Sequence, residues 1–376
     1  MPTCPLQARR CGGCTRLSVP YDRQLSAKRK KLEALYPGEE VLPVLGMRTP
    51  YRYRNKVIAS VACDHGRLIT GQYAYGTHYV LDQQDCLLEN ERAGQIVAGV
   101  RDILNEARVP VWDEDKKTGL IRFIQVRYAQ RTGEALVTLV TGRERFRDGA
   151  AIAGRIHDRM PDVISVVQNI NERPGSAVLG FEDRLMYGGG VISDTLCGLR
   201  VLLSSRAFYQ INSLQAERLY EEALRLADIR PDETVLDLYC GIGLIGMLAA
   251  ARAKSVVGIE QNPSAISLAN RIKALNGVGS ISFIRGDAAA VMREQPLEAD
   301  LVIVDPPRAG LSDSLIDTLI KRQPRKILYI SCDPVTQARD VAKLRAKVPY
   351  VLSPIQPVDM FPHTDHVETV VLLSRK

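Results

Sequence analysis

The 376-residue sequence contains no apolar run approaching the roughly 18 residues that a membrane-spanning helix needs. Its start, Met1-Pro-Thr-Cys, lacks the features of a secretory signal peptide. The middle of the chain shows no internal repeat and no low-complexity segment. We therefore expect a cytoplasmic protein. In that compartment, eight cysteines are more often reduced, metal-bound or catalytic than paired in disulfides.

Charge is unevenly distributed along the chain. Residues 1–60 contain twelve Lys and Arg against four Asp and Glu, a net charge of +8. The whole chain carries +7, so the remainder carries 7 − 8 = −1. A basic region on a near-neutral body is typical of a polyanion-binding protein, although a solvated basic face would look the same.

Three cysteines stand close together near the start, in a C-x6-C-x2-C pattern: Cys4, Cys11 and Cys14. The glycine pair between the last two allows the tight backbone turn that directs two thiolates at one metal. Cys86 is the best candidate for a fourth ligand, and Cys63 is its competitor. Spacing alone allows either zinc or an iron–sulfur cluster.

Two basic segments follow the cysteines. Residues 21–36 have the periodicity of an amphipathic helix, whose basic side would consist of Arg23, Lys28, Arg29, Lys30 and Lys31. Residues 49–56, Thr-Pro-Tyr-Arg-Tyr-Arg-Asn-Lys, interleave aromatic rings with cations, a mixture that suits RNA. A half-exposed strand would give the same alternation.

The chain changes character near residue 200. Short β-like runs with one or two helices between about 57 and 203 indicate an α+β domain with a largely antiparallel sheet. From residue 233 onward, apolar strands alternate with helices, as in a doubly wound α/β sheet. We therefore predict domains at 1–200 and 201–376.

Polar residues follow several of these α/β strands. Gly241, Gly243 and Gly246 form a G-x-G-x-x-G after a strand, and Glu260 ends the next strand, a pattern that fits either NAD or S-adenosylmethionine. The residues that favour the methyl donor are Asp237 before the glycines, Asp287 after the third strand, and Asp305-Pro-Pro-Arg308 after the fourth.

A thiol also stands at a strand end. The buried-type run 327–330 ends in Ser331-Cys332-Asp333-Pro334, and the chemistry of open α/β sheets lies just past such ends. Cys332 is therefore a candidate nucleophile. The alternative is that Cys332 only packs in the core as a small hydrophobic residue. We assign Cys63, Cys197 and Cys240 to packing. His363 and His366 are expected to be loop residues or RNA contacts.

Taken together, these motifs resemble the RNA 5-methyluridine (uracil-C5) methyltransferases. The segments that carry the resemblance are CPLQARRCGGC at 4–14, Tyr21-x-x-Gln-Leu-x-x-Lys28, Tyr53-Arg-Asn-Lys56, Phe208-Tyr-Gln-Ile-Asn212, Asp237-Leu-Tyr-Cys-Gly241, Val304-Asp-Pro-Pro-Arg308, Tyr329-Ile-Ser-Cys332 and His366-Val-Glu368. The resemblance implies a nucleophile, Cys332, and a proton-abstracting base, Glu368. It further implies methyl-donor contacts at Gln210, Tyr239, Glu260 and Asp305, and a [4Fe-4S] cluster on Cys4, Cys11, Cys14 and Cys86. It also implies that the early helix can pack on the catalytic domain.

Within the family, the sequence is most similar to the short, cluster-bearing members that methylate a loop uridine of 23S rRNA. The tRNA-modifying members lack the cysteine cluster, and the longer ribosomal members carry an N-terminal barrel for which Cys4 leaves no room. We thus expect a monomeric enzyme whose partner is RNA, not DNA or a membrane. The alternatives are the same reaction on another rRNA or tRNA uridine, a non-catalytic iron–sulfur RNA-binding protein, and an NAD-linked oxidoreductase.

Overall fold

A computed structural model describes residues 3–83, 85–143, 146–173, 175 and 177–375. The chain forms two compact units, each built from separate stretches of sequence. The first unit contains Met1–Ser18, Tyr51–Thr195 and Val201–Ser213, and the second contains Val19–Pro50, Leu196–Arg200 and Leu214–Lys376. The division therefore differs from a single boundary near residue 200. In the part of the chain that the structure describes, no helix is long and apolar enough to cross a membrane.

The first unit is built on a seven-stranded sheet. Its strands are β1 (Lys56–Asp64), β2 (Arg67–Tyr73), β3 (Val80–Asp82), β4 (Ile121–Tyr128), β5 (Ala135–Thr141), β6 (Val163–Ile170) and β7 (Glu182–Tyr187). They lie in the order β3-β2-β1-β4-β5-β6-β7. Only β5 and β6 pair in parallel, and the crossover between them contains a helix, as parallel pairing requires. The expected, largely antiparallel α+β domain is present.

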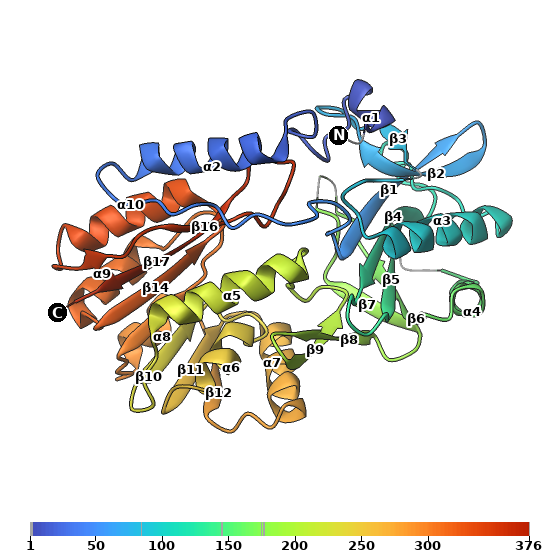
Figure 1. Cartoon of the computed structure of the whole chain (residues 1–376). Coiled ribbons are helices and arrows are strands. Elements are labelled where there is room, and N and C mark those ends of the chain that lie inside the picture. The colour runs from blue at the N-terminus through green and yellow to red at the C-terminus, as the bar shows by residue number, and fades with distance from the viewer. Residues whose placement is uncertain (1–2, 84, 144–145, 174, 176, 376) are drawn as a thin grey trace. The chain divides into compact units, whose positions relative to one another are not determined.

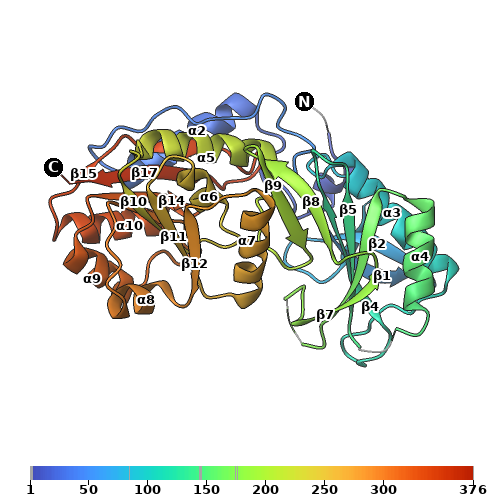
Figure 2. The same cartoon turned by 90° about the horizontal axis from the view of Figure 1, so that it is seen from below.

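Two helices, α3 (Glu91–Glu106) and α4 (Gly149–Arg159), lie side by side against this sheet (Figure 2). The Asn90 side chain caps α3 by accepting a hydrogen bond from Ala93 N at 3.1 Å. The apolar stripe of α3 is fully buried, and it joins residues of both helices and five strands in one core. The unit also contains α1 (Pro5–Ala8) and most of the hairpin formed by β8 (Val191–Leu196) and β9 (Leu199–Ser204).

The second unit contains the predicted doubly wound sheet. Its strands are β10 (Thr234–Leu238), β11 (Ser255–Glu260), β12 (Ile281–Arg285), β13 (Leu301–Val304), β14 (Lys326–Ser331), β15 (Val351–Leu352), β16 (Gln356–Val358) and β17 (Glu368–Ser374). The order is β12-β11-β10-β13-β14-β17-β15, with β16 also pairing with β17. The strands β10 to β14 are parallel, whereas β17 runs antiparallel to β14.

Helices alternate with these strands. They are α5 (Ser213–Ala227), α6 (Leu244–Ala250), α7 (Pro263–Leu275), α8 (Ala288–Glu294), α9 (Asp313–Arg322) and α10 (Pro334–Arg345). A continuous core joins α8, α9 and α10 to the sheet. Because β10 pairs with β11 on one side and β13 on the other, the strand order reverses at β10. Ligands of such sheets bind outside the carboxyl ends of the strands at this switch point.

The early helix α2 (Tyr21–Leu35) belongs to the second unit and lies along α10 (Figure 1). Leu32 is fully buried in the core of this unit, and the Tyr36 hydroxyl donates a hydrogen bond to Gln337 Oε1 at 2.7 Å. The Gln24 side chain bonds both to the ring of His363 and to its backbone N–H, each at 3.0 Å. Buried His363 is therefore a packing residue, and its suggested role as an RNA contact is wrong.

Lys28 also departs from the expectation drawn from helical periodicity. Its ammonium group lies 2.6 Å from Asp359 Oδ1, and both side chains are buried. Burial lowers the pKa of Lys28, while the Asp359 carboxylate opposes that change. Lys28 thus holds α2 to the segment before β17 and is not part of an exposed basic side.

Candidate active site and cysteine cavity

The loop after β10 combines a buried carboxylate with a glycine-rich turn. Asp237 is fully buried near the end of β10, and neither of its carboxylate oxygens has a hydrogen-bond partner among the described residues. Burial raises the pKa of Asp237 to about 8, with further contributions from Asp305 and Glu260 and an opposing one from the Gly246 amide. An unpartnered buried carboxylate is costly, so this site fits a cationic ligand.

Two of the motif glycines are required by close packing. A Cβ on Gly246 would lie 2.7 Å from the Asp237 carboxylate. Gly243 has a φ of +79°, and a Cβ there would lie 2.6 Å from the Phe283 ring. Since an L side chain would collide in both places, these glycines let the turn stay close to the end of β10.

The predicted donor contacts lie at three strand ends and in one segment of the first unit. Glu260, the last residue of β11, accepts hydrogen bonds from Gly241 N at 3.2 Å and Asn262 N at 2.7 Å, so it also shapes the glycine turn. Tyr239 follows β10 with a φ of +64°, a conformation unusual for a residue with a side chain. Asp305 follows β13. Gln210 is buried in the first unit, where its backbone carbonyl oxygen accepts a hydrogen bond from Asn55 Nδ2 at 2.9 Å.

Cys332 directly follows β14, and Glu368 is the first residue of β17. The two strands are antiparallel, and their pairing ends with Ser331 opposite Thr369. Glu368 itself pairs with Val358 of β16, and Cys332 lies in the bend after β14. The Glu368 carboxylate is close enough to raise the pKa of the Cys332 thiol, so the two predicted residues are neighbours at this end of the sheet.

The electrostatics of this region are dominated by buried acids. Burial raises the pKa of Glu368 to about 8, and Asp305 adds to the effect while Arg308 opposes it. Burial likewise raises the pKa of Asp305 to about 7. The half-buried Cys332 thiol has its pKa raised to about 11 by burial, then by Glu368 and Asp305, again opposed by Arg308. Groups that interact in this way titrate as a coupled set.

Two neighbours of this set did not emerge from the sequence as site residues. Tyr220 of α5 is buried, and its pKa is raised first by burial and then by Asp305, Glu368 and Asp237. Nothing in its helical periodicity distinguishes it from a core residue. Arg308 belongs to the recognised Asp-Pro-Pro-Arg motif, but only the structure shows that its charge acts on Cys332 and Glu368.

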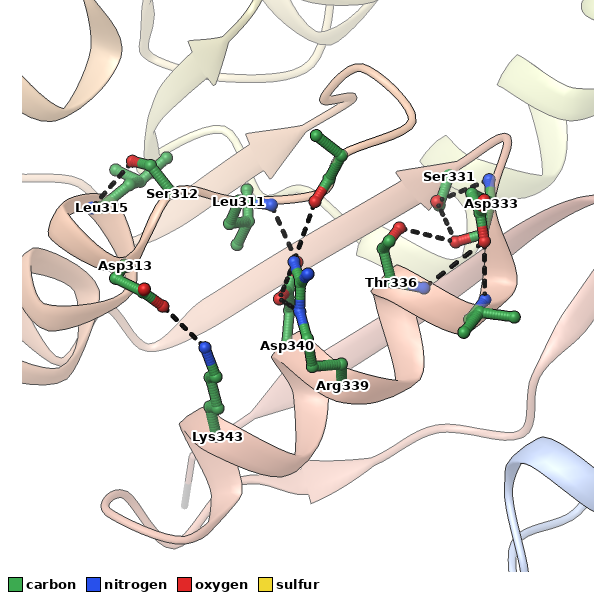
Figure 3. Close-up of polar contacts among 12 residues, drawn as sticks. Leu311, Ser312, Asp313, Leu315, Ser331, Asp333, Thr336, Arg339, Asp340 and Lys343 are labelled. Carbon is green, nitrogen blue, oxygen red and sulfur yellow. Dashed lines mark hydrogen bonds and ion pairs between the residues drawn. The ribbon is translucent and has the colours of Figure 1, made fainter.

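The loop that contains Asp305 and Arg308 is tied to α10, the helix after Cys332 (Figure 3). Asp340, fully buried, accepts hydrogen bonds from Leu311 N and the Tyr329 hydroxyl, both at 2.8 Å, and pairs with Arg339. Arg339 donates to Ala309 O at 2.9 Å. We call this network, Asp340 and Arg339 with the groups they hold, the Asp340 clamp. It links two adjacent strand ends through one buried carboxylate.

The predicted cluster ligands lie in the first unit. The thiols of Cys4, Cys11, Cys14 and Cys86 line one cavity, together with apolar side chains that include Leu6 and Leu17. A Cβ on Gly13 would lie 3.6 Å from Cys11 Sγ, so the glycine leaves room beside that thiol. As they are placed, no three His, Cys, Asp or Glu side chains among the described residues form a metal-binding group. The cavity therefore collects four thiols of suitable chemistry without showing a metal site.

The aromatic and basic stretch at 49–56 supports this cavity. Tyr53 is buried, and Arg54 donates to Gly13 O at 2.9 Å. Arg52 donates to Cys86 O at 2.6 Å and pairs with Asp85. The interpretation of this stretch as an RNA-stacking platform is therefore wrong for Tyr53, which is buried, and Arg54 holds the cysteine loop through Gly13. Cys63 is exposed on β1, outside the cavity, which removes it both as a competitor for Cys86 and as a packing residue.

Comparison with known proteins agrees with this geometry. The profile of the tRNA (uracil-5-)-methyltransferase family matches residues 198–376. An uncharacterised RNA methyltransferase of Halalkalibacterium halodurans is 37% identical over 382 residues, which cover 99% of this chain and 83% of the relative. One from Listeria innocua is 37% identical over 383 residues, covering 100% of this chain and 84% of the relative.

A solved structure covers both units. The tRNA (uracil-54, C5)-methyltransferase of Pyrococcus abyssi, in complex with S-adenosyl-L-homocysteine, superposes with a TM-score of 0.81 at 29% identity, over 99% of this chain and 87% of that one. The fold is thus that of the α/β S-adenosylmethionine-dependent methyltransferases. More narrowly, the chain belongs to the RNA (uracil-5-)-methyltransferase family, which confirms the resemblance seen in the sequence. It is an enzyme that methylates RNA.

Proposed function

We propose that this protein transfers a methyl group from S-adenosylmethionine to C5 of one uridine in 23S rRNA, giving 5-methyluridine. The observation that carries the proposal is the position of Cys332 directly after β14, a central parallel strand, with Glu368 at the start of β17 acting on its thiol. This arrangement supplies a nucleophile and a base at the carboxyl end of the parallel strands, where ligands of such sheets bind.

The donor site is proposed at the ends of β10, β11 and β13. When bound, S-adenosylmethionine supplies an electrophilic methyl group on a positively charged sulfur. The unpartnered Asp237 carboxylate and the raised pKa of Asp305 fit a cationic ligand that would restore their charged forms. Tyr239, Glu260 and Asp305 would hold the donor in the second unit, and Gln210 is the candidate from the first.

The proposed chemistry begins with the thiolate of Cys332. Uracil C5 is a weak nucleophile, and addition of sulfur to C6 moves electron density through the ring to C5, which can then take the methyl group. A base-modifying enzyme needs its target base out of the stack, so the uridine is expected to be extruded.

The role proposed for Glu368 follows the methyl transfer. C5 then bears both a methyl group and the original proton, and the carboxylate removes that proton. The electrons of the broken C5–H bond re-form the C5=C6 double bond, and the sulfur of Cys332 leaves as thiolate. The buried position of Glu368, 3% exposed, keeps water from competing for this carboxylate.

We also propose that Cys4, Cys11, Cys14 and Cys86 hold a [4Fe-4S] cluster. Four thiols from two segments lining one cavity match the ligand number and chemistry of such a cluster. Bound there, it would cross-link the N-terminal turn to the segment between β3 and α3. Anaerobic purification followed by iron, sulfide and zinc analysis tests the assignment, and stoichiometric zinc without sulfide would refute it.

The choice of 23S rRNA rests on the cysteine-rich N-terminus, which is typical of the short ribosomal members. A tRNA uridine is the second candidate, because the Pyrococcus abyssi neighbour acts on tRNA. Incubating unmodified 23S rRNA and unmodified tRNA with labelled donor distinguishes the two. We expect label in 5-methyluridine of the ribosomal RNA; label confined to tRNA would favour the second candidate, and label in another base would overturn both.

A pair of substitutions tests the mechanism. Cys332→Ala should bind RNA and donor yet form no covalent species. Glu368→Gln should add to C6, transfer the methyl group and stop, because elimination needs the C5 proton removed. The expected product is methylated RNA joined to Cys332, seen as a slow band on a denaturing gel and as a modified peptide by mass spectrometry. Full turnover by Glu368→Gln, or an adduct on another cysteine, would contradict the assignment.

A further inference from the structure

A hairpin in the first unit exposes an unusual number of aromatic rings. The segment between β2 and β3 and the strand ends beside it contain Tyr73, Tyr75 and Tyr79, which are 38%, 68% and 62% exposed. Burying the ring of a tyrosine is strongly favourable, because it removes a large aromatic surface from water. Exposed rings gathered on one hairpin therefore indicate a surface that is covered by a partner.

The pairing of the hairpin sorts these rings onto two faces. Tyr73 pairs with Val80, and Ala74 N donates to Tyr79 O at 2.9 Å, so Tyr79 opposes Ala74. Side chains alternate along a strand, which puts Tyr79 on the face opposite to Tyr73, whereas Tyr75 lies in the turn between the two strands. The His78 ring lies 5.7 Å from the Tyr73 ring, on the same face as Tyr73.

Cations from the N-terminal turn lie next to this face. Tyr75 N donates to Arg10 O at 2.8 Å, and Cys11 bridges to Ala74, so the turn runs antiparallel beside the hairpin. Arg9 and Arg10 are exposed. Residues 1–18 contain three arginines and no Asp or Glu. Residues 72–79 contain no Lys, Arg, Asp or Glu and one histidine, His78. The surface is therefore aromatic and positive.

We infer that Tyr73, Tyr75, His78 and Arg10, here called the tyrosine face, bind unstacked bases of the single-stranded part of the RNA substrate. The inference rests on the proposed function for the identity of the RNA. Flat rings stack on any base, and a neighbouring guanidinium meets the phosphates, which is the chemistry of single-strand binding surfaces. This role replaces the one predicted for residues 49–56, where Tyr53 is buried and Arg54 donates to Gly13 O in the lining of the cysteine cavity.

Substitutions on the two faces of the hairpin test the inference. With the full chain purified anaerobically, Tyr73→Ala and Tyr75→Ala should each weaken binding to a short single-stranded oligouridylate about tenfold, at an unchanged salt slope. Arg10→Ala should instead reduce the slope of the logarithm of the binding constant against the logarithm of the salt concentration by about one. Tyr75→Phe keeps the ring and should bind normally. Tyr79→Ala is the matched control, since it removes an equally exposed ring from the other face.

Methyl transfer gives an independent readout. With unmodified 23S rRNA, Tyr75→Ala should raise KM about tenfold and leave kcat at saturating RNA unchanged. If wild-type protein does not methylate this RNA, the proposed function fails while the oligouridylate comparison still decides the tyrosine face. Wild-type affinity in Tyr75→Ala, or equal weakening by Tyr79→Ala, would overturn the inference.

Cross-linking to the wild-type protein tests the inference even if some variants lose iron or fold poorly. An oligonucleotide carrying 4-thiouridine, bound and irradiated, should cross-link to the peptides containing residues 72–79 or Arg10. A duplex of the same length should not compete with it. Cross-links found only elsewhere in the chain would remove the tyrosine face from the RNA-binding surface.

Discussion

Cys332 follows β14 and Glu368 begins β17, and neither residue is conspicuous by composition. The antiparallel pairing of these strands, which ends at Ser331 and Thr369, places both residues at the same end of the sheet. The buried surroundings then raise the pKa of both groups, to about 11 and about 8 respectively, with burial as the main cause in each case. The site is thus set up to keep protons until a cationic donor or a substrate arrives.

The coupling between these two residues can be measured directly. Glu368→Gln removes a negative charge that raises the Cys332 pKa, so the thiol should become a thiolate at a pH about one unit lower. Arg308→Gln removes a positive charge that lowers it and should shift the thiol in the opposite direction. The measurement is the pH dependence of iodoacetamide labelling, followed on the Cys332 peptide by mass spectrometry. Shifts of the same sign in both variants would contradict the arrangement.

The same acids should affect folding stability. The pKa of Glu368 is raised from 4.5 to about 8, so in the unliganded protein the folded state keeps a proton that the unfolded chain releases. Stability from this group is complete below pH 4.5 and is lost as pH rises to about 8. Glu368→Gln should therefore stabilise the protein at pH 8 by on the order of 4 kcal/mol and have little effect at pH 4.5. Urea unfolding at both pH values tests this; an equal effect at both would contradict it.

At the scale of elements, the Asp340 clamp fixes the loop after β13 to the helix after β14. The carboxylate receives donors from the loop, from β14 and from α10 itself, so its loss affects all three elements. Gly310 allows the close approach, with a φ of +78° and a Cβ position 2.5 Å from Asp340 Oδ2.

Asp340→Asn should therefore loosen the site as well as the fold. The amide keeps one oxygen but turns an N–H group toward donors, which leaves buried groups unpaired and should cost about 1–3 kcal/mol. We expect weaker donor binding, because Asp305 begins the clamped loop. Thermal unfolding and calorimetric donor titration are the measurements. Lys343→Ala, which breaks only an exposed pair with Asp313, is the control and should change neither quantity measurably.

The lysines of α2 have two different roles, one in the core and one on the surface. Lys28 is buried against Asp359, whereas Lys30 and Lys31 are exposed. Lys28→Met leaves an uncompensated buried carboxylate and should cost about 3–5 kcal/mol of stability. Lys30→Ala with Lys31→Ala should leave stability within about 0.5 kcal/mol. If these two lysines contact phosphate, the double variant should also flatten the salt dependence of RNA binding by about 1–2. Salt titrations with each variant measure this, and an unchanged slope would show that the lysines are merely solvated.

At the scale of the whole molecule, the chain contributes its basic N-terminal region to both units. Val19–Pro50 joins the second unit, while the residues before and after it join the first. The +8 charge of residues 1–60 is therefore not one patch on one domain. Six of the twelve Lys and Arg lie in Val19–Pro50 and six in the flanking stretches, and the proposed cluster concerns only the first unit.

Loss of the proposed cluster should consequently act on the N-terminal turn. Apart from the thiols, residues 4–14 are held by few contacts, such as the Arg54 bond to Gly13 and the Cys11 bridge to Ala74. Iron chelation should therefore speed proteolytic cleavage within this turn about tenfold. Cys86→Ser should lose iron and behave like the chelated protein. Cys63→Ser, exposed on β1, is the control and should retain iron; the reverse result would move the fourth ligand.

The order of strands and helices in the second unit could be predicted from sequence because each element carries a local signal. A central strand such as Leu301–Val304 is buried on both sides and is therefore continuously apolar. The first polar residues after β13 and β14 are recognisable because they interrupt these apolar runs. They mark the carboxyl ends of the strands, where ligands of such sheets bind. Asp305 and Cys332 were found as candidates in this way.

Other features depend on contacts between distant residues, which no local pattern encodes. Periodicity could not show that Lys28 is buried against Asp359, that Arg54 bonds to the cysteine loop, or that Tyr220 lies among the acids. The division of the chain into two interleaved units is of the same kind. The sequence by itself determined the family, the α/β sheet and the residues capable of chemistry, since those follow from composition and short-range order. Only the tertiary structure decided which cations are buried, which rings are exposed and which carboxylates act on the Cys332 thiol, because burial and strand pairing are properties of the packed chain.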